Sequence, residues 1–141
     1  MNVASAGQVP IDFDDPMLER RYDGVRAYRQ SKLAEVMFTF ELAERLRAGG
    51  ETGVTVNALH PATFMNTKMV REAAIHPASA VEEGVRATLR LAVAPELDGF
   101  TGRYFDRMNE ARARDQAYDP DARRRLWRLS EELVAAGEGR G

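Results

Sequence analysis

Two short runs of apolar and β-branched residues, separated by one long helical segment, constrain the fold of this 141-residue chain more than any other feature. The runs cover 2–7 and 54–59, and each leads into turn residues, the second into the loop 60–67. Such runs are typical of buried strands that break into loops. The segment 28–48 between them has helical composition and periodicity. A strand, a helix and a strand in this order predict a βαβ unit with a right-handed crossover.

In open parallel sheets, ligands bind outside the carboxyl ends of the strands. Ser5 ends the first strand and the loop 61–67 follows the second, so both are expected at this edge. Tyr28 opens the helix and is expected at the opposite edge, unless the chain first returns across the sheet through the turn-rich segment 7–27. Periodicity alone therefore does not place Tyr28 beside Ser5.

Tyr28 and Lys32 stand four residues apart, about one helical turn, so the phenol and the ammonium share one face. A positive charge near a phenol favours the phenolate, which can exchange a proton with an alcohol or a carbonyl. Taken alone, such a pair is more often a surface tyrosine with a solvated lysine. Ser5 taken alone is often just a loop cap at a strand end.

The order of the motifs changes this interpretation. Successive segments read Val3-Ala4-Ser5-Ala6-Gly7, Tyr28-Arg29-Gln30-Ser31-Lys32 and Leu59-His60-Pro61-Ala62-Thr63. This order resembles the C-terminal half of the short-chain dehydrogenase/reductase family. The segment 27–46 resembles its retinol-dehydrogenase-like branch, and 101–105 resembles the last strand of its sheet.

The resemblance implies an α/β fold, the C-terminal part of a Rossmann-like doubly wound parallel sheet with about three strands and flanking helices. It predicts a single partial domain over 1–141 that ends in a helix over 119–137. Nothing in the chain matches the glycine-rich phosphate loop of such folds, so the N-terminal nucleotide-binding half is expected to be absent.

Carried over by position, the resemblance also implies roles for individual residues. Tyr28 would be the catalytic acid/base, Lys32 would stabilise the phenolate and bind the nicotinamide ribose, and Ser5 would orient the substrate oxygen. The expected cofactor is NAD or NADP, with no preference indicated. The cofactor-binding residues would be Tyr28, Lys32, Pro61, Ala62, Thr63 and Thr67.

The cofactor loop departs from the family pattern at two points. Ala62 replaces the usual glycine, and the spacing to Thr67 is one residue longer than in the common pattern. Thr63 and Thr67 are therefore both candidates for the hydroxyl that contacts the cofactor. For each of them, a role in a turn or as a helix cap is the alternative.

Two classes of function follow from these motifs. The first is an NAD(P)-dependent oxidoreductase acting on a small alcohol or carbonyl substrate, an apolar one if Met65, Met69, Val70 and Ile75 line its site. The second is a truncated, non-enzymatic remnant, or an interaction module that lacks cofactor binding and uses an exposed helix face and an unpaired strand edge. In either case the isolated chain is expected to be marginally stable, with little or no cofactor affinity. A further alternative is that Met1 is an internal methionine of a longer protein.

Composition limits the partners. A net charge of −2 gives no reason to expect nucleic acid, and no apolar run is long enough to span a bilayer. The chain has no cysteine and two histidines, so no metal site is predicted and a cytoplasmic location is expected. The helix 28–48 predicts a homodimer contact, with packing inside the monomer as the alternative. The run Arg123, Arg124, Arg125 is interpreted as a solvated face.

Overall fold

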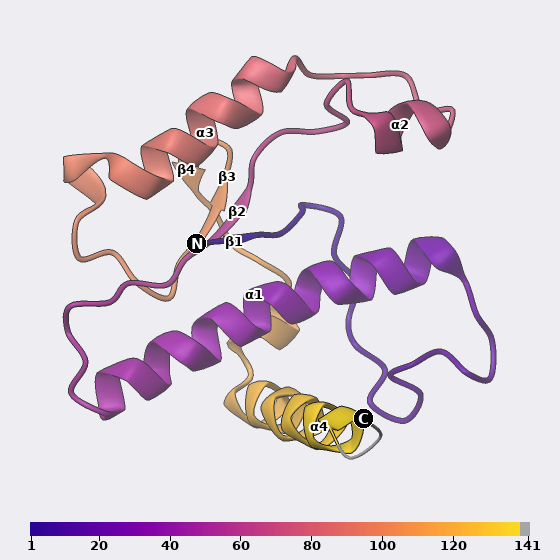
Figure 1. Ribbon diagram of the computed structural model, residues 1–141, viewed down its shortest axis with the longest axis vertical. Helices are drawn as coiled ribbons and strands as arrows, with labels where there is room; N and C mark the ends of the chain where they lie inside the picture. Colours follow the sequence, from indigo (N-terminus) through magenta and orange to yellow (C-terminus); the bar gives the residue numbers. More distant parts are fainter. Residues whose placement is uncertain (139–141) are drawn as a thin grey trace.

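The computed structural model describes residues 1–138 and confirms the α/β class (Figure 1). A fourth strand, short and antiparallel, was not predicted. The elements in chain order are β1 (Asn2–Val3), α1 (Gly24–Ala48), β2 (Ala58–His60), α2 (Lys68–Glu72), α3 (Val81–Val93), η1 (Pro95–Leu97), β3 (Tyr104–Asp106), β4 (Asn109–Glu110), η2 (Asp115–Tyr118) and α4 (Pro120–Glu138).

The sheet has the strand order β1-β2-β3-β4. β1, β2 and β3 are parallel, with Val3 opposite Leu59 and Leu59 opposite Phe105, and β4 returns antiparallel to β3. β1 is therefore an edge strand, and its outer side has no neighbouring strand within residues 1–138. The three parallel strands end on the same edge of the sheet, which is where the predicted site should lie.

Helix α1 begins one turn earlier than the periodicity indicates. The Asp23 carboxylate accepts a hydrogen bond from the backbone N–H of Arg26 at 2.6 Å and so caps the helix at Gly24. Gly49 ends it, with its N–H bonded to the carbonyl of Arg45. The inner face of α1 places fully buried side chains against the sheet, among them Leu33, Val36 and Met37.

The molecule is layered as α4, α1, sheet and α3 (Figure 1). Side chains alternate along the strands: Ala58 and Tyr104 join the core beneath α1, whereas Leu59 and Phe105 join the core beneath α3. α1 and α3 therefore cover opposite faces. Because both connections step in the same direction between parallel strands, they must have opposite hands. One of the two crossovers is thus left-handed, the rare hand for such units.

Helix α4 packs on the outer side of α1. Asp119 caps it by accepting from the N–H groups of Asp121 and Ala122, and Pro120 is its first residue. Arg123 was expected on a solvated face, and for this residue the interpretation is wrong. Its side chain is 6% exposed. It is held by a carbonyl and two acidic side chains, because α4 turns it inward onto α1: Ala117, Glu41 and Glu44.

Candidate functional site

Ser5 lies at the carboxyl edge of the sheet, two residues beyond β1, and is buried. Its Oγ accepts a hydrogen bond from the N–H of Gly7 at 3.1 Å. Its carbonyl accepts from the side-chain amide of Gln8 at 2.7 Å. The backbone around Ser5 is therefore fixed, while the hydroxyl proton remains free to be donated to another oxygen.

The first turns of α1 lie beside Ser5, because the segment 7–27 returns across the sheet, so Tyr28 does not lie at the opposite edge. α1 runs antiparallel to β1, so its start meets the carboxyl end of the strand and its middle meets the other end, where Asn2 bonds Thr39. At the site end, the N–H of Val9 donates to the carbonyl of Arg29 at 3.3 Å. The side chain of Arg29 also packs near Gly7.

Tyr28 and Lys32 share one face of α1, as their spacing predicts. Tyr28 is 42% exposed. The Lys32 ammonium lies 5.8 Å from the centre of the Tyr28 ring. It donates to the carbonyl of Val3 at 3.2 Å and to both carboxylate oxygens of Glu35 at 3.0 Å. Lys32 therefore connects the tyrosine to the strand that carries Ser5.

The loop 61–67 follows β2 at the same edge. Pro61 and Ala62 are buried beside the end of β2. Thr63 is held in a network: its Oγ1 lies 3.1 Å from His60 Nε2 and accepts from the guanidinium of Arg107 at 3.1 Å. Arg107 can only donate, so the Thr63 oxygen accepts from it, while the direction of the bond with His60 depends on the tautomer of the ring. Thr63 is thus occupied by the protein itself.

The charge state of His60 agrees with this network. Burial lowers the pKa of His60 below its ordinary 6.5, the negative charge of Asp106 partly opposes this, and Arg107 adds to the lowering. The neutral ring can accept from Thr63 through Nε2. Thr67 differs, because it precedes α2 without any side-chain capping bond. Within residues 1–138 its hydroxyl has no protein partner, so it is the freer of the two threonines.

Sequence reasoning missed two residues that shape the site. Gln8 bonds the Ser5 carbonyl and also accepts from the backbone of Arg114, a residue 106 positions away. Arg107 holds Thr63 from the turn after β3. No local pattern indicates either contact, because each joins segments that only the folded sheet brings together.

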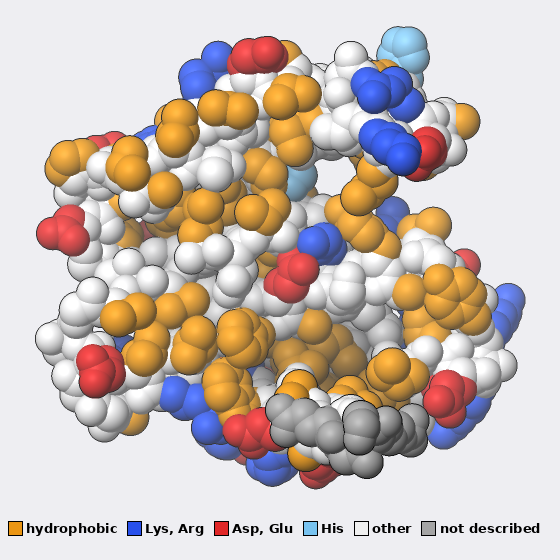
Figure 2. Space-filling model, in the orientation of Figure 1, with side chains coloured by type: hydrophobic (Ala, Val, Ile, Leu, Met, Phe, Trp, Pro, Cys, Tyr) orange, Lys and Arg blue, Asp and Glu red, His pale blue; other side chains and the backbone are white. Residues whose placement is uncertain are grey.

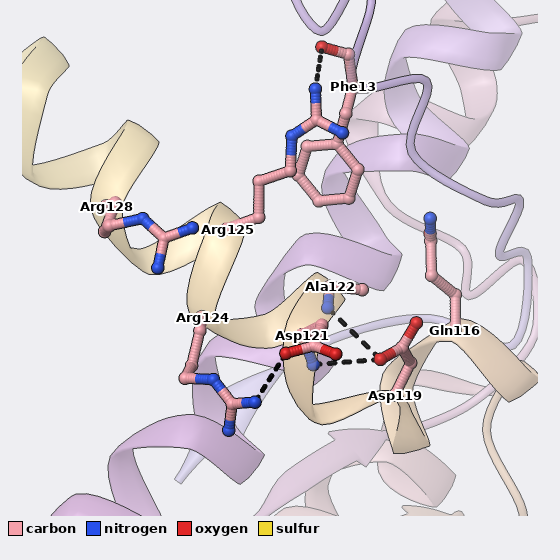
Figure 3. Close-up of a pocket in the computed structure, with 8 residues that line it drawn as sticks. All are labelled: Phe13, Gln116, Asp119, Asp121, Ala122, Arg124, Arg125 and Arg128. Carbon is pink, nitrogen blue, oxygen red and sulfur yellow. Dashed lines mark hydrogen bonds and ion pairs between the residues drawn. The ribbon is translucent and has the colours of Figure 1, made fainter.

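A cavity of about 370 Å³ lies elsewhere, between the segment around Phe13 and the start of α4 (Figure 3). None of the predicted site residues lines it. Its polar groups are largely engaged with one another: Arg124 pairs with Asp121, and Arg125 donates to the carbonyl of Phe13 while lying over its ring. It is therefore not the site indicated by the motifs.

Exposed apolar side chains surround the α2 segment near the carboxyl edge. Phe64, Met69 and Ile75 are exposed, whereas Val70 is buried. The surface is hollowed between this segment and the first turns of α1 (Figure 2). Within the described residues, no helix has the length and apolar character needed to cross a membrane.

Comparison with known proteins gives relatives but no match to a family model. The chain is 35% identical to retinol dehydrogenase 13 of Mus musculus, over all of this chain and 46% of that protein. It is 37% identical to human retinol dehydrogenase 14, over 88% of this chain and 40% of that protein. A probable oxidoreductase of Streptomyces lividans is 32% identical, over 91% of this chain and 52% of its own length.

A solved structure is also similar. The crystal structure of an uncharacterised protein from Mycobacterium paratuberculosis superposes with a TM-score of 0.74 at 29% identity, over 94% of this chain and 48% of that chain. The chain thus spans about half the length of the relatives it matches. With its motif order and open parallel sheet, this chain belongs to the short-chain dehydrogenase/reductase family and corresponds to the C-terminal half of proteins in the retinol-dehydrogenase-like branch.

Proposed function

We propose that this chain provides the catalytic half of an NAD(P)-dependent oxidoreductase that interconverts an alcohol and a carbonyl compound. The observation that carries the proposal is the Lys32 ammonium, which lies over the Tyr28 ring and reaches the end of β1, two residues before Ser5. The three residues named by the motifs are thereby gathered at one edge of the sheet. The relatives named as oxidoreductases and retinol dehydrogenases support the same class of reaction.

In the oxidation direction, Tyr28 as phenolate removes the proton from the substrate hydroxyl. The C–H bond of the same carbon breaks, its electron pair leaves as hydride, and a carbonyl forms. Ser5 donates its free hydroxyl proton to the substrate oxygen and holds it near the phenol. In reduction, Tyr28 returns the proton to the oxygen. A nicotinamide, when bound, supplies or accepts the hydride.

The residues of this chain fit the nicotinamide end of such a cofactor in part. The Thr67 hydroxyl has no protein partner within residues 1–138 and stands at the carboxyl edge, so we assign it, rather than Thr63, to the cofactor amide. Pro61 and Ala62 are buried earlier on the same loop, at the end of β2. Lys32 would bind the ribose hydroxyls, but in this structure its donors are directed to Val3 and Glu35.

The decisive test is NADH- or NADPH-dependent reduction of apolar aldehydes, with retinal and a straight-chain aldehyde as substrates. The isolated chain is expected to bind cofactor weakly, so the substitution is made in a full-length form of the protein, where Tyr28→Phe should abolish turnover and leave cofactor binding nearly unchanged. Tyr22→Phe is the matched control, because Tyr22 is an exposed tyrosine on the preceding loop and should keep full activity. Turnover by the Tyr28→Phe protein would refute the acid/base assignment.

The second candidate function, an interaction module without cofactor binding, is favoured by a separate surface. Val81, Val85, Leu89 and Val93 recur every four residues along α3 and are all exposed, and apolar side chains gather over this helix in Figure 2. The outer edge of β1 is also open. If this function holds, the purified chain should show no saturable binding of NADH or NADPH by fluorescence titration. Saturable binding would exclude it.

Self-association through the helix 28–48 stays a prediction. The outer side of α1 is packed against α4, with Phe38 stacked on Trp127 at 5.3 Å between ring centres. A dimer contact would have to use the part of α1 that α4 leaves uncovered. Light scattering of the purified chain tests this, since a mass of twice 15.7 kDa supports the dimer and a monomer mass excludes it.

A further inference from the structure

Lys32 has no hydrogen-bond donor left for Tyr28 or for a cofactor. A lysine ammonium carries three N–H donors. In this structure three acceptors surround it, the carbonyl oxygen of Val3 at 3.2 Å and the two carboxylate oxygens of Glu35 at 3.0 Å each. Its contact with Tyr28 is over the ring face at 5.8 Å, close to the outer limit of a cation–π contact.

We propose that Glu35 is a positioning residue that holds Lys32 against the edge of β1, neutralises its charge and thereby restrains ionisation of the Tyr28 phenol. The inference rests on the proposed function and concerns the regulation of the same site. It adds a residue that lies outside the tyrosine–lysine motif.

Helix geometry places the three side chains in one row. Positions 28, 32 and 35 are separated by four and three residues, so they stand on the same face of α1. The Glu35 carboxylate has no other hydrogen-bond or ion-pair partner within residues 1–138, because the bond from Thr39 goes to its backbone carbonyl. The carboxylate is therefore committed to Lys32.

No other charge competes for Lys32 in the described part of the chain. From β1, the facing group is the neutral carbonyl of Val3. The charged groups on the other segments packed against α1 are paired elsewhere: Asp12 with Arg26, Arg123 with Glu44, and Asp115 with Arg112. Among the charged groups of residues 1–138, Lys32 and Glu35 therefore pair only with each other, while Arg29 lies next to Tyr28 on α1 and forms no ion pair.

Replacing Glu35 with glutamine should favour the phenolate form of Tyr28 in two ways. A negative charge seven residues away, about 10 Å along the helix, is removed. Lys32 also regains donors and an uncompensated positive charge next to Tyr28.

The experiment is an ultraviolet titration of tyrosinate in the full chain without cofactor or substrate. The signal of Tyr28 is isolated by subtracting the titration of the matching Tyr28→Phe protein, once in the natural background and once with Glu35→Gln. We expect the midpoint to fall in Glu35→Gln. Glu72→Gln removes the same charge from the distant Lys68–Glu72 pair and should leave the midpoint unchanged.

A structural role for Glu35 would give a different result. If the ion pair only supported the helix, Glu35→Gln would lower the melting temperature without moving the Tyr28 midpoint, and that outcome overturns the inference. Glu35→Asp keeps the charge but shortens the arm, so it should shift the midpoint less than Glu35→Gln. In a Lys32→Met background, the effect of Glu35→Gln should shrink, because part of it acts through Lys32.

The titration also separates this inference from the proposed function. If the midpoint shifts but no hydride transfer is detected, the inference is supported and the proposed reaction is refuted. If hydride transfer is detected but the midpoint does not shift, the proposed reaction is supported and the inference is refuted.

Discussion

Arg123 offers the sharpest test of what joins α4 to the rest of the molecule. Its side chain is 6% exposed, and the Glu41 carboxylate that it approaches at 3.7 Å is 7% exposed. It also donates to Glu44 at 2.8 Å and to the carbonyl of Ala117 at 3.1 Å. Replacing Arg123 with methionine keeps most of the buried volume but leaves a carboxylate in a dry interface.

The magnitude follows from the partners that remain. Breaking a buried ion pair by removing one member costs about 3 to 5 kcal/mol. Glu41 keeps Arg45 at 2.9 Å, so the loss for Arg123→Met should fall near the lower end, about 3 kcal/mol. For a chain of this length that corresponds to a melting temperature lower by roughly 10 °C.

Urea unfolding followed by circular dichroism measures this loss. Arg124→Met is the matched control, since Arg124 is its neighbour on α4 but pairs with an exposed carboxylate, Asp121. Exposed pairs contribute about 0 to 1 kcal/mol, so this control should unfold near the natural protein. Adding Glu41→Gln to Arg123→Met should recover part of the loss. Equal stabilities for the Arg123 and Arg124 variants would refute the reasoning.

Three further predictions concern polar groups that are buried or partly buried. Burial lowers the pKa of His60, so the folded state disfavours the charged ring, and the free energy of unfolding should decrease as the pH falls below about 6.5. Between pH 7.5 and 5, the melting temperature should therefore fall less for His60→Gln than for the natural protein. An equal fall in the two proteins would contradict this. Burial, with the charge of Asp106, raises the pKa of Tyr104 to about 12, so folding stability should be lost as the pH rises above 10. Its buried hydroxyl makes no hydrogen bond of good geometry within residues 1–138, although the side chain of Gln8 lies close enough to lower the pKa slightly. Tyr104→Phe should therefore change thermal stability little at pH 7 and should remove that alkaline loss. Gln116 exchanges two hydrogen bonds with the backbone of Ile11, so Gln116→Ala should cost about 1 to 3 kcal/mol in urea unfolding, whereas a loss below 0.5 kcal/mol would show that water replaces both bonds.

The features that sequence predicts well are those encoded by neighbouring residues. Gly49 ends α1, and Asp119 with Pro120 starts α4, because capping depends on side chains within one turn of the helix end. The start of α1 was placed late because Asp23 caps it from a segment with turn composition. β4 was missed because two residues carry no periodicity.

Contacts across the fold were beyond local reasoning. The burial of Arg123 depends on acidic partners about eighty positions earlier, and no run of charges in α4 indicates that these face inward. The opposite hands of the two crossovers depend on which face of the sheet each helix covers. Ala58 faces the core beneath α1 and Leu59 faces the core beneath α3. In a strand that is buried on both faces, the hydrophobic pattern does not indicate which helix covers which face.

The candidate site shows how far a motif determines chemistry. Four-residue spacing is sufficient to place Tyr28 and Lys32 on one face, and the antiparallel run of α1 is sufficient to bring that face to Ser5. Neither fixes where the ammonium directs its donors. That is decided by Glu35 and by the carbonyl of Val3 on an edge strand. The placement of the ammonium is therefore a property of the motif together with its next helical turn and the strand beneath it, and a substitution at Glu35, outside the motif, should be able to change it.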